Sequence, residues 1–404
     1  MTSSPEHRGL STALLLLMAV ATGLCAGGNY FNQPLLDTIA TALHTTHAAA
    51  AATVTIAQVA YAAGLVLLVP LGDMTERRNL AVGLMLAAAT GQAISGFSTG
   101  IGMLSVGIAT AGLFSVAAQV LVPLAATLAA PGRSGRAVGT VMSGLLLGIL
   151  LARSVAGVLA GLGGWWTVYR LSAVLMVAIA FALWRALPAS RPRHATGYLA
   201  TLRSTIRLAL ELPRLRTRAL LGALSFASLS ALFSTMAFLL AAPPFDLSDT
   251  GIGLVGLAGV AGALAANAAG GLADRGGSQL ATCIALAILV GSWPLFSLGG
   301  TSLTWFLVAM VLADLGLQGI HVSNQSIIYA LAPEARARLT SVYMTTYFVG
   351  AAAGSSLGSA AWSMWGWTGV VWLGGGLSLA SVLAWLLDLR VAARAELPAA
   401  ARAR

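Results

Sequence analysis

Long apolar runs separated by short polar segments fill the chain from end to end. Twelve of them reach about 20 residues, the length that an α-helix needs to cross the ~30 Å hydrocarbon core of a bilayer. They are residues 10–34, 49–71, 80–98, 102–129, 137–161, 167–187, 218–241, 251–272, 279–299, 302–331, 339–361 and 367–388. The first run continues into Asn29–Pro34, so we expect a helix of the mature protein and not a cleaved signal. The pattern predicts an all-α membrane protein with twelve transmembrane helices.

The composition excludes several classes of function. Only 8% of the residues are charged and 58% are hydrophobic, which is too little polar surface for a soluble globule. The net charge of +10 comes from arginines in short blocks between apolar runs, so we exclude nucleic acid as a partner. Cys25 and Cys283 lie inside apolar runs, where we expect small buried residues and no disulfide or zinc site. The sequence holds no nucleotide loop, metal-ligand cluster or catalytic triad, which predicts no enzyme activity, cofactor or metal.

The arginines lie on one side of the predicted helices. Basic loops are retained in the cytoplasm. If the N-terminus is inside, every arginine except Arg153 and Arg170 falls in a cytoplasmic segment, including the whole 185–218 block. The outward loops then hold no arginine, only Asp37, Asp246 and Asp249. We therefore expect an integral multi-pass protein of the bacterial cytoplasmic (inner) membrane, with both termini inside.

The longest polar segment, residues 188–217, divides the chain into two six-helix halves, residues 1–187 and 218–404. It is rich in arginine, and apolar side chains recur in it at helical spacing: Leu199, Leu202, Ile206 and Leu210. This pattern predicts a helix lying in the anionic inner interface of the membrane. An ordinary connector that its charge keeps inside is the alternative.

The two halves are related by an internal repeat. An offset of 202 residues carries Arg136 to Arg338 and Gly148 to Gly350, at corresponding places in the two halves. Six helices repeated in the same orientation imply a pseudo-twofold axis along the membrane normal. Such symmetry places a cavity between the halves near the midplane and lets the halves rock around it. A channel or a receptor has less need of this arrangement.

A loop motif occurs once in each half, between its second and third helices. The copies are residues 69–78, VPLGDMTERR, and residues 270–277, GGLADRGG. They resemble the loop signature of the major facilitator superfamily, whose fold is two pseudo-symmetric six-helix halves. The resemblance implies a latch of the outward-facing state, in which an aspartate caps a helix and pairs with arginine. The implied latch residues are Asp73, Arg77, Arg78, Asp274 and Arg275, and the first copy departs from the signature at Val69, Met74 and Glu76.

Two further segments resemble a bacterial branch of the superfamily that exports drugs and sugars in exchange for protons. They are residues 29–36 on the first predicted helix and residues 144–153 on the fifth. The resemblance implies a proton-coupled efflux transporter of a small organic solute. The fourth helix has Gln119 where such antiporters usually carry arginine, and the fifth has Ala152-Arg153 where they show Gly-Pro. We interpret Arg153 as a relocation of the missing charge.

The tenth predicted helix carries a polar stripe. Asp314, Gln318, His321 and Gln325 follow at spacings of four, three and four residues, which places them on one helical face. Asp314 lies roughly 18 Å from the outer end, near the midplane, where an ionised group costs at least ~2.5–3.5 kcal/mol. We therefore predict that Asp314 carries a coupling proton, with His321 as the second candidate. A neutral Asp314 bonded to a neighbouring helix, and a packing histidine, are the alternatives.

Arg153 is the one arginine predicted deep in a span, since Arg170 lies only three residues into its helix and can extend to the surface. Its guanidinium needs an anion, and Asp314 is the only carboxylate predicted at that depth. The first expectation is a charge pair between them, or a proton-linked network through His321. Attraction of an anionic substrate and contacts with backbone carbonyls are the alternatives.

Uncharged polar side chains complete the candidate substrate cavity. Amides, hydroxyls and rings orient a ligand by hydrogen bonding and stacking. The candidates are Asn29, Asn32, Gln33, Gln58, Tyr61, Gln119, Gln318, Asn324, Gln325, Tyr343 and Tyr347. The three amides beside Pro34 also supply hydrogen-bond partners for a kink in the first helix. For each residue alone, an interhelical hydrogen bond is the alternative.

Together these patterns predict a secondary active transporter of a small organic solute, in the first place a proton-driven exporter that works by alternating access. Its expected partners are the solute, protons and the lipid bilayer, and we expect a monomer. An uptake symporter or a facilitator is the main alternative. A membrane sensor of the same shape is a more remote one, because the 16 residues after Asp388 offer no signalling domain.

Overall fold

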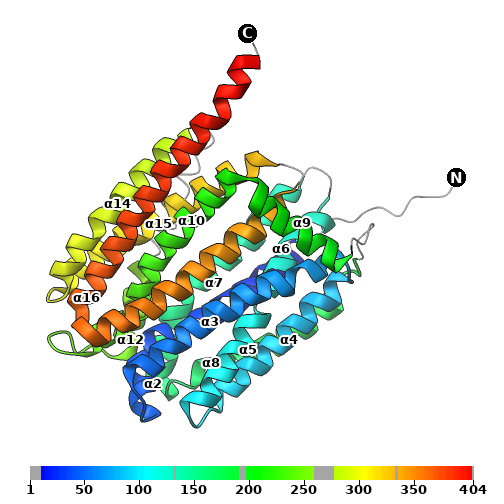
Figure 1. The fold of residues 1–404 in the computed structure, drawn as a ribbon. Helices are drawn as coiled ribbons and strands as arrows, with labels where there is room; N and C mark the ends of the chain where they lie inside the picture. The colour runs from blue at the N-terminus through cyan, green and yellow to red at the C-terminus, as the bar shows by residue number, and fades with distance from the viewer. Residues whose placement is uncertain (1–10, 131–132, 191–196, 259–276, 333–334, 403–404) are drawn as a thin grey trace.

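The computed structural model describes residues 11–130, 133–190, 197–258, 277–332 and 335–402. Within these ranges all regular structure is helical. Long helices run side by side along one direction, as Figure 1 shows. The structure confirms the predicted all-α fold of a twelve-helix membrane protein.

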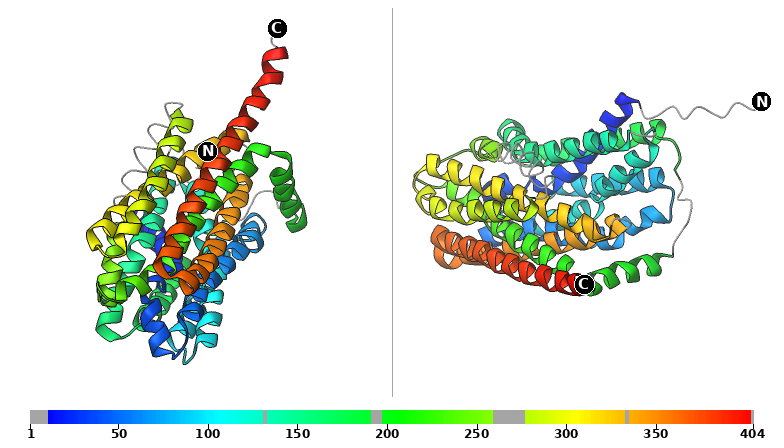
Figure 2. Two further views of the ribbon diagram at one scale, coloured as in Figure 1. Left: turned by 60° about the vertical axis from the view of Figure 1, so that its left-hand side comes forward. Right: turned by 90° about the horizontal axis from the view of Figure 1, so that it is seen from above.

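The first half of the chain alternates long α-helices with short 3₁₀ segments, which are labelled η. Its elements are α1 (Thr12–Gly27), η1 (Gly28–Tyr30), η2 (Gln33–Leu35), α2 (Leu36–Ala42), α3 (His47–Leu67), η3 (Val69–Asp73), α4 (Arg77–Gly96), α5 (Ile101–Phe114), α6 (Ala117–Leu128), α7 (Ser134–Gly163) and α8 (Thr167–Ala186). The polar segment that follows contains α9 (Tyr198–Glu211), with Leu199, Ile206 and Leu210 exposed. Figure 2 shows α9 at the edge of the bundle.

The second half repeats this plan. Its elements are α10 (Pro213–Phe233), α11 (Met236–Ala241), α12 (Asp249–Val255), η4 (Gly256–Ala258), α14 (Ser278–Gly299), α15 (Leu303–Leu331) and α16 (Arg336–Arg402). α16 contains two spans, because the chain turns at Gly366, whose φ of 58° favours glycine. The predicted eighth span begins in α12 and η4, and its remainder lies outside the described residues.

In the described chain, nine helical segments are long and apolar enough to cross a membrane, and the one over residues 336–394 holds two predicted spans. Large apolar side chains such as Val174, Phe181 and Trp372 are exposed on the outer surface, where lipid would cover them. Cys25 is buried, but Cys283 is exposed on α14, so the prediction that both cysteines are buried is wrong for Cys283. A small apolar residue fits a lipid-facing surface as well as a protein core.

The first span is interrupted, as the sequence predicted. α1 ends at Gly27, the chain continues through η1 and η2, and α2 begins at Leu36. Pro34 has no backbone N–H to donate to a regular helix. The side chains of Asn29, Asn32 and Gln33 are all buried at this break. The corresponding span of the second half is also interrupted, between α10 and α11.

Two glycine contacts, one in each half, bring a pair of helices unusually close. Gly148 on α7 packs against the backbone of Gly23 on α1, and a Cβ atom at Gly148 would collide with it. Gly350 on α16 packs in the same way against the backbone of Ala223 on α10. Gly148 and Gly350 are the residues that the sequence offset of 202 relates, so the repeat extends to helix packing.

The bundle has two ends. α1 begins and α16 finishes at one end, which we call the terminal face, while the loop between α2 and α3 and the turn at Gly366 lie at the opposite end, the distal face (Figure 1). Hydrogen bonds between the halves cluster toward the distal face: Thr38 to Asp249, Ser154 to Gly253, Thr250 to Gly157, and Thr55 to Ser355. The deepest ring contact between the halves joins Tyr61 and Phe348, whose ring centres are 4.5 Å apart. The described residues therefore show two halves that close on each other from the distal face to about the middle.

Candidate substrate and coupling site

Arg153 lies on α7 where the two halves meet, and only 5% of it is exposed. Its Nε donates to Gln33 Oε1 at 2.7 Å. The guanidinium carbon lies 3.8 Å from the centre of the Phe233 ring and 5.2 Å from that of Tyr30. Gln33 and Tyr30 belong to the interrupted first span, whereas Phe233 is the last residue of α10 in the second half. The cation is therefore held by one amide and two aromatic rings drawn from both halves.

Asp314 faces this cation from the second half. It lies on α15 and is partly exposed. Arg153 and Asp314 interact electrostatically, although their charged atoms are not within the 4.0 Å of an ion pair. Among the described residues, the Nη1 and Nη2 nitrogens of Arg153 have no hydrogen-bond acceptor. The two charges therefore oppose each other across the boundary between the halves, and the guanidinium keeps donors for a further partner.

His321 lies on α15 inside an aromatic and polar cluster. Its Nδ1 is 3.1 Å from the Tyr343 hydroxyl, and its Nε2 is 3.1 Å from the Gln325 amide nitrogen. The Tyr347 ring lies 5.1 Å from the imidazole and stacks on Phe226 at 4.2 Å. The structure thus brings His321, a predicted proton-coupling candidate, together with three predicted cavity residues: Gln325, Tyr343 and Tyr347.

A buried ion pair continues this cluster toward the terminal face. Asn324, the next predicted residue, accepts from Arg218 Nη1 at 3.3 Å and donates to the Tyr343 hydroxyl at 3.5 Å. Arg218 forms two contacts with Asp388, from Nε at 2.8 Å and from Nη2 at 2.6 Å. Both side chains are fully buried. Gln279 and Thr282 on α14 accept the remaining bonds of the guanidinium.

The first half contributes a second polar contact near the middle. Gln119 on α6 donates to the Tyr61 hydroxyl at 3.3 Å, and the Tyr61 ring packs on Phe348 of the second half. Gln58 is buried on α3, and Gln318 is partly exposed on α15 between Asp314 and His321. Within the described ranges, neither of these two amides has a hydrogen-bond partner.

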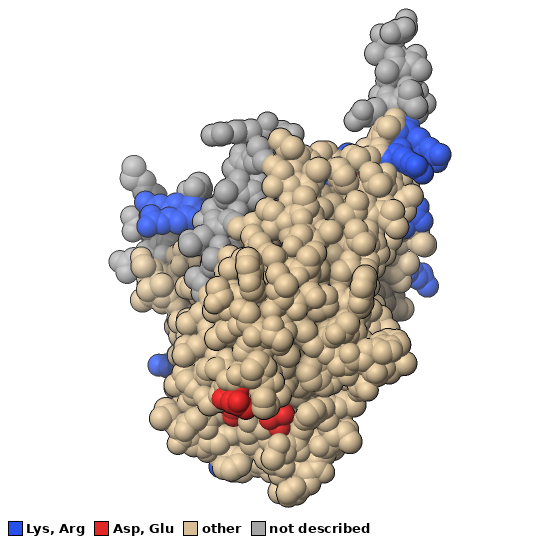
Figure 3. Space-filling view, turned by 90° about the vertical axis from the view of Figure 1, so that its left-hand side faces the viewer, with Lys and Arg blue, Asp and Glu red and all other residues tan. Residues whose placement is uncertain are grey.

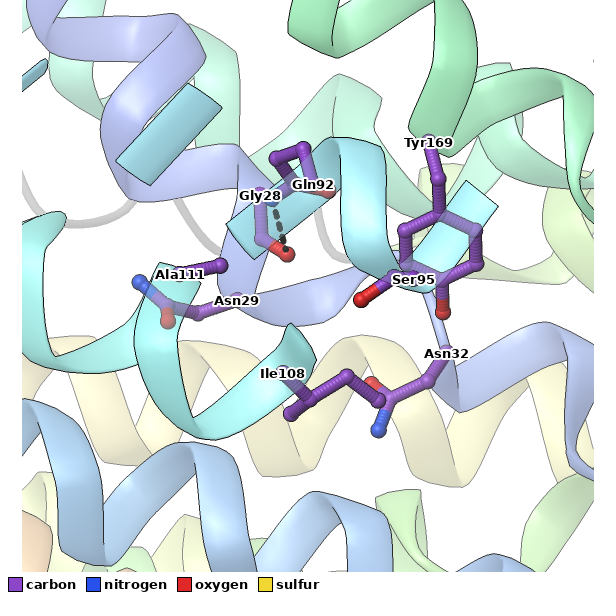
Figure 4. Close-up of a pocket in the computed structure, with 8 residues that line it drawn as sticks. All are labelled: Gly28, Asn29, Asn32, Gln92, Ser95, Ile108, Ala111 and Tyr169. Carbon is purple, nitrogen blue, oxygen red and sulfur yellow. Dashed lines mark hydrogen bonds between the residues drawn. The ribbon is translucent and has the colours of Figure 1, made fainter. Parts of the chain in front are cut away.

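Asn29 and Asn32 face a different place from Gln33. They line a small pocket inside the first half, of about 10 Å³, together with Gly28, Gln92, Ser95, Ile108, Ala111 and Tyr169 (Figure 4). Asn32 also donates to Thr53 at 2.9 Å. The Gln92 amide oxygen and the Tyr169 hydroxyl are buried without a partner among the described residues. The three predicted amides are therefore divided between this pocket and the boundary at Arg153.

The loop motif is described in its first copy only, because Asp274 and Arg275 lie outside the described residues. Arg77 Nε donates to the Gly72 carbonyl oxygen at 2.9 Å, and Arg78 donates to that of Leu187 at 3.2 Å. The backbone at Asp73 belongs to η3, and its side chain is not described. The motif thus connects the start of α4 to neighbouring helix ends of the first half.

Glu76, one of the departures from the family signature, caps α4. Its carboxylate accepts from the backbone N–H groups of Arg78 and Asn79, at 3.1 and 3.0 Å. It also accepts from the N–H of Ser190, at 3.0 Å, which leads into the polar segment between the halves. Burial raises the pKa of Glu76, but these three N–H groups and the Arg78 charge outweigh it, so the pKa is lowered below its ordinary value. A carboxylate at this helix start was expected from Asp73, and Glu76 supplies it.

Charged side chains are sorted between the two ends of the molecule. In the view of Figure 3, most blue basic side chains lie toward the end that carries the C-terminal helix, and the red acidic ones lie near the opposite end. The acidic residues placed there by the fold include Asp37 and Asp249. This sorting agrees with the uneven distribution of arginine along the sequence.

The Arg218–Asp388 pair was not predicted from the sequence. Arg218 is the last residue of the basic block 185–218, and Asp388 is the last residue of the final predicted span. The available signal was that both charges border apolar runs at the same face, so that the helix ends that carry them can meet. Phe226 and Phe233, which pack on Tyr347 and Arg153, carried no signal because apolar residues surround them in the sequence.

The chain belongs to the Major Facilitator Superfamily, whose family model matches residues 18–324 and 278–403. It is 52% identical over 383 residues, 95% of this chain and 97% of the relative, to the uncharacterized transporter YgaY of Escherichia coli O157:H7. It is 33% identical to the probable transporter SCO4007 of Streptomyces coelicolor, over 91% of this chain and 86% of that protein. The crystal structure of a mutant of the nucleoside transporter NupG has the same fold, with a TM-score of 0.77, 15% identity, and coverage of 93% of this chain and 99% of that one. The protein is thus a membrane transporter of this superfamily.

Proposed function

We propose that this transporter exports a small organic solute in exchange for protons by alternating access. The observation that carries the proposal is the pair of opposed charges at the boundary between the halves. Arg153 comes from the first half and Asp314 from the second, and no ion pair within 4.0 Å joins them. A group that ionises in apolar surroundings is costly, and its protonation state therefore responds to which side the cavity opens. Asp314 is the proposed proton carrier.

The proposed orientation follows from the arginines. Loops rich in arginine stay in the cytoplasm, so the terminal face with both termini is assigned to that side and the distal face to the outside. The hydrogen bonds between the halves then close the outer side, as in an inward-facing transporter. Movement of the halves around Arg153 and Asp314 would close the cytoplasmic side and open the outer side. Asp73, Arg77, Arg78, Asp274 and Arg275 are the proposed latch of the outward-facing state.

The polar groups around this boundary are the proposed solute contacts. Gln33 positions Arg153, while Tyr61, Gln119, Tyr343 and Tyr347 present hydroxyl, amide and aromatic groups near the middle of the molecule. A ligand site of this kind combines apolar rings with a few oriented polar groups. Efflux is proposed on the resemblance of residues 29–36 and 144–153 to proton-coupled exporters.

A second candidate function is symport of an organic anion with a proton. It is favoured by the two Arg153 nitrogens that have no acceptor among the described residues, since guanidinium donors bind carboxylate and phosphate groups in pairs. If Asp314 takes up a proton, its charge no longer attracts Arg153, and an anion could then bind the guanidinium. Proton and solute would bind together in that case, whereas exchange requires that they bind in turn.

The sign of proton movement distinguishes the two functions. Purified protein in proteoliposomes that enclose a pH-sensitive dye would be offered a library of solutes that do not titrate near neutral pH, beginning with ethidium, glucose and benzenesulfonate. Exchange predicts an alkaline lumen as a solute enters, and symport predicts an acidic one. Asp314→Asn should abolish either signal, while Asp246→Asn, an exposed change outside the boundary, should preserve it. Solute entry without any proton movement in the wild type would leave a facilitator and contradict the proposal.

A further inference from the structure

A chain of hydrogen-bonded side chains runs from the buried ion pair to His321. Asp388 binds Arg218, Arg218 donates to Asn324, Asn324 donates to Tyr343, and Tyr343 contacts His321. The chain joins α16, α10 and α15 within the second half. Each link restricts which atom of the next group donates, so the direction of every hydrogen bond can be worked out from the ion pair outward.

Arg218 fixes the orientation of Asn324. A guanidinium carries only donors, so the Asn324 atom 3.3 Å from Arg218 Nη1 must be the amide oxygen. The amide nitrogen of Asn324 then points to the Arg218 carbonyl oxygen, at 3.3 Å, and to the Tyr343 hydroxyl, at 3.5 Å. The orientation of Asn324 therefore does not depend on an arbitrary choice between its oxygen and nitrogen.

Asn324 in turn fixes the hydroxyl of Tyr343. The hydroxyl oxygen accepts from Asn324, so the phenolic hydrogen is left to donate to His321 Nδ1, 3.1 Å away. If His321 carried its hydrogen on Nδ1 instead, the Tyr343 hydroxyl would accept twice. Its own hydrogen would then have no acceptor among the described residues, although Tyr343 is 1% exposed. Leaving a buried donor without a partner costs free energy.

These directions determine the tautomer of His321. Nδ1 is an acceptor, so the neutral imidazole carries its hydrogen on Nε2 and donates on the side of Gln325. The Gln325 amide nitrogen lies 3.1 Å from Nε2 and cannot accept this hydrogen. This tautomer therefore requires the Gln325 amide to be rotated by half a turn, which places its oxygen there as the acceptor. Gln325 is partly exposed, so the Nε2 side of His321 is the side open to a ligand.

We infer that the chain from Asp388 holds His321 as the neutral Nε2–H tautomer, which makes His321 a fixed hydrogen-bond donor in the solute site and not a proton carrier. This inference rests on the proposed transport function, and Tyr343 is its positioning residue. A second proton would have to enter at Nδ1, where the Tyr343 hydrogen already lies. Arg218 behind Asn324 also opposes another positive charge.

The other groups around the imidazole agree with this assignment. Tyr347 on α16 is a second phenol, and α14 contributes the uncharged Gln279 and Thr282 to the chain. Asp314, two helical turns away on α15, is the carboxylate on the same helical face. Of the two candidates that the sequence offered as proton carriers, Asp314 alone is left in that role.

Nitrogen NMR of the imidazole tests the inference without any solute. Protein labelled with ¹⁵N-histidine and placed in lipid nanodiscs would be measured between about pH 5 and 8, the interval in which an ordinary histidine titrates. The His321 signals would be assigned by their loss in His321→Gln. In the wild type we expect a hydrogen-bonded acceptor Nδ1 and a protonated Nε2 throughout. In Tyr343→Phe we expect a changed Nδ1 signal and uptake of a proton within the interval.

Tyr347→Phe is the matched control, because Tyr347 contacts the same imidazole by its ring and has no hydrogen bond to it. It should leave the His321 signals unchanged. An Nδ1–H tautomer in the wild type, protonation of wild-type His321 above about pH 5, or a Tyr343→Phe spectrum equal to the wild type would each overturn the inference. If Tyr343→Phe fails to fold, the tautomer observed in the wild type still tests the inference. A protein with this tautomer but no proton-coupled transport would disprove the proposed function alone.

Discussion

The Arg218 guanidinium and the Asp388 carboxylate form a fully buried ion pair, with Nη2 and Oδ2 2.6 Å apart. The pair joins the second turn of α10 to the part of α16 near the terminal face. Thr217 and Gln279 satisfy further bonding positions of the two groups, at 2.7 Å each. Because both charges are removed from solvent, each one is stabilised only while the other is present.

Loss of one partner should therefore destabilise the protein more than loss of both. Asp388→Asn leaves Arg218 buried without a counter-charge, which we expect to lower the free energy of unfolding by about 3–5 kcal/mol. The double variant Arg218→Met with Asp388→Leu should recover much of this loss. The midpoints of thermal unfolding in detergent would compare the single and the double variant with the wild type. Arg390→Gln, an exposed change on the same helix, is the control, and equal midpoints for it and Asp388→Asn would refute the prediction.

Asp314→Asn imitates a permanently protonated carboxyl at the boundary between the halves. We expect transport driven by a pH gradient to fall to background, while solute binding and solute exchange at equal pH remain measurable. The comparison is between gradient-driven transport and exchange in the same proteoliposomes. If gradient-driven transport continued at the wild-type rate, Asp314 would not carry the proton.

Arg153 and Asp314 should behave as a coupled pair. Arg153→Gln removes the charge that faces Asp314, so we expect it to shift the pH dependence of transport. The double variant with Asp314→Asn should lose less transport activity than the two single variants lose together. Once one charge is gone, removing the other no longer breaks their interaction. Arg170→Gln is a suitable control, since Arg170 also stacks on a ring, with its guanidinium 4.5 Å from Phe97, but lies near a helix end. Strict additivity would show that the two charges act independently.

The Glu76 carboxylate should stabilise the protein at a pH above its ordinary pKa, and this stabilisation should be lost in strong acid. Its pKa is lowered in the folded protein, so its contribution is present near neutral pH and is lost as the pH falls through the folded-state value, below the ordinary 4.5. Glu76→Gln keeps one acceptor oxygen and should cost about 1 kcal/mol near pH 7. The difference from the wild type should vanish in acid. Glu211→Gln, at an exposed carboxylate paired with Arg207, should show little effect at either pH.

The proposed orientation can be tested with introduced cysteines in a protein whose Cys25 and Cys283 are replaced by alanine. Arg203→Cys on α9 and Thr301→Cys in the turn before α15 are both exposed positions at opposite faces. An impermeant thiol reagent applied to intact cells should label Thr301→Cys and not Arg203→Cys. The reverse pattern would place the terminal face outside.

The sequence predicted those features of the fold that depend on local pattern. The break at Asn29–Pro34 followed from amides beside a proline, and the equivalence of Gly148 and Gly350 followed from the offset of 202 residues. These signals lie within one or two helices, where periodicity and residue type determine the outcome. The twelve-helix fold rested on the same kind of information.

The partners of buried polar groups could not be read in this way. Asp388 pairs with a residue 170 positions away, and the choice depends on how α10 crosses α16. The separation of Asn29 from Gln33 likewise depends on the turn of the interrupted span, which places Asn29 at the pocket inside the first half and Gln33 against Arg153. From their spacing in the sequence, these amides were predicted to share one site, whereas the folded chain places them at two different sites.

The close contacts at Gly148 and Gly350 limit which parts of this molecule can move. Two helices whose backbones are already in contact cannot slide or twist against each other without breaking those contacts. The pair α1 and α7 would therefore move as one rigid body, and the pair α10 and the first part of α16 as another. Any change of shape must be taken up at side-chain contacts outside these two pairs, such as those of Tyr61 and Thr55 on α3 with Phe348 and Ser355 on α16.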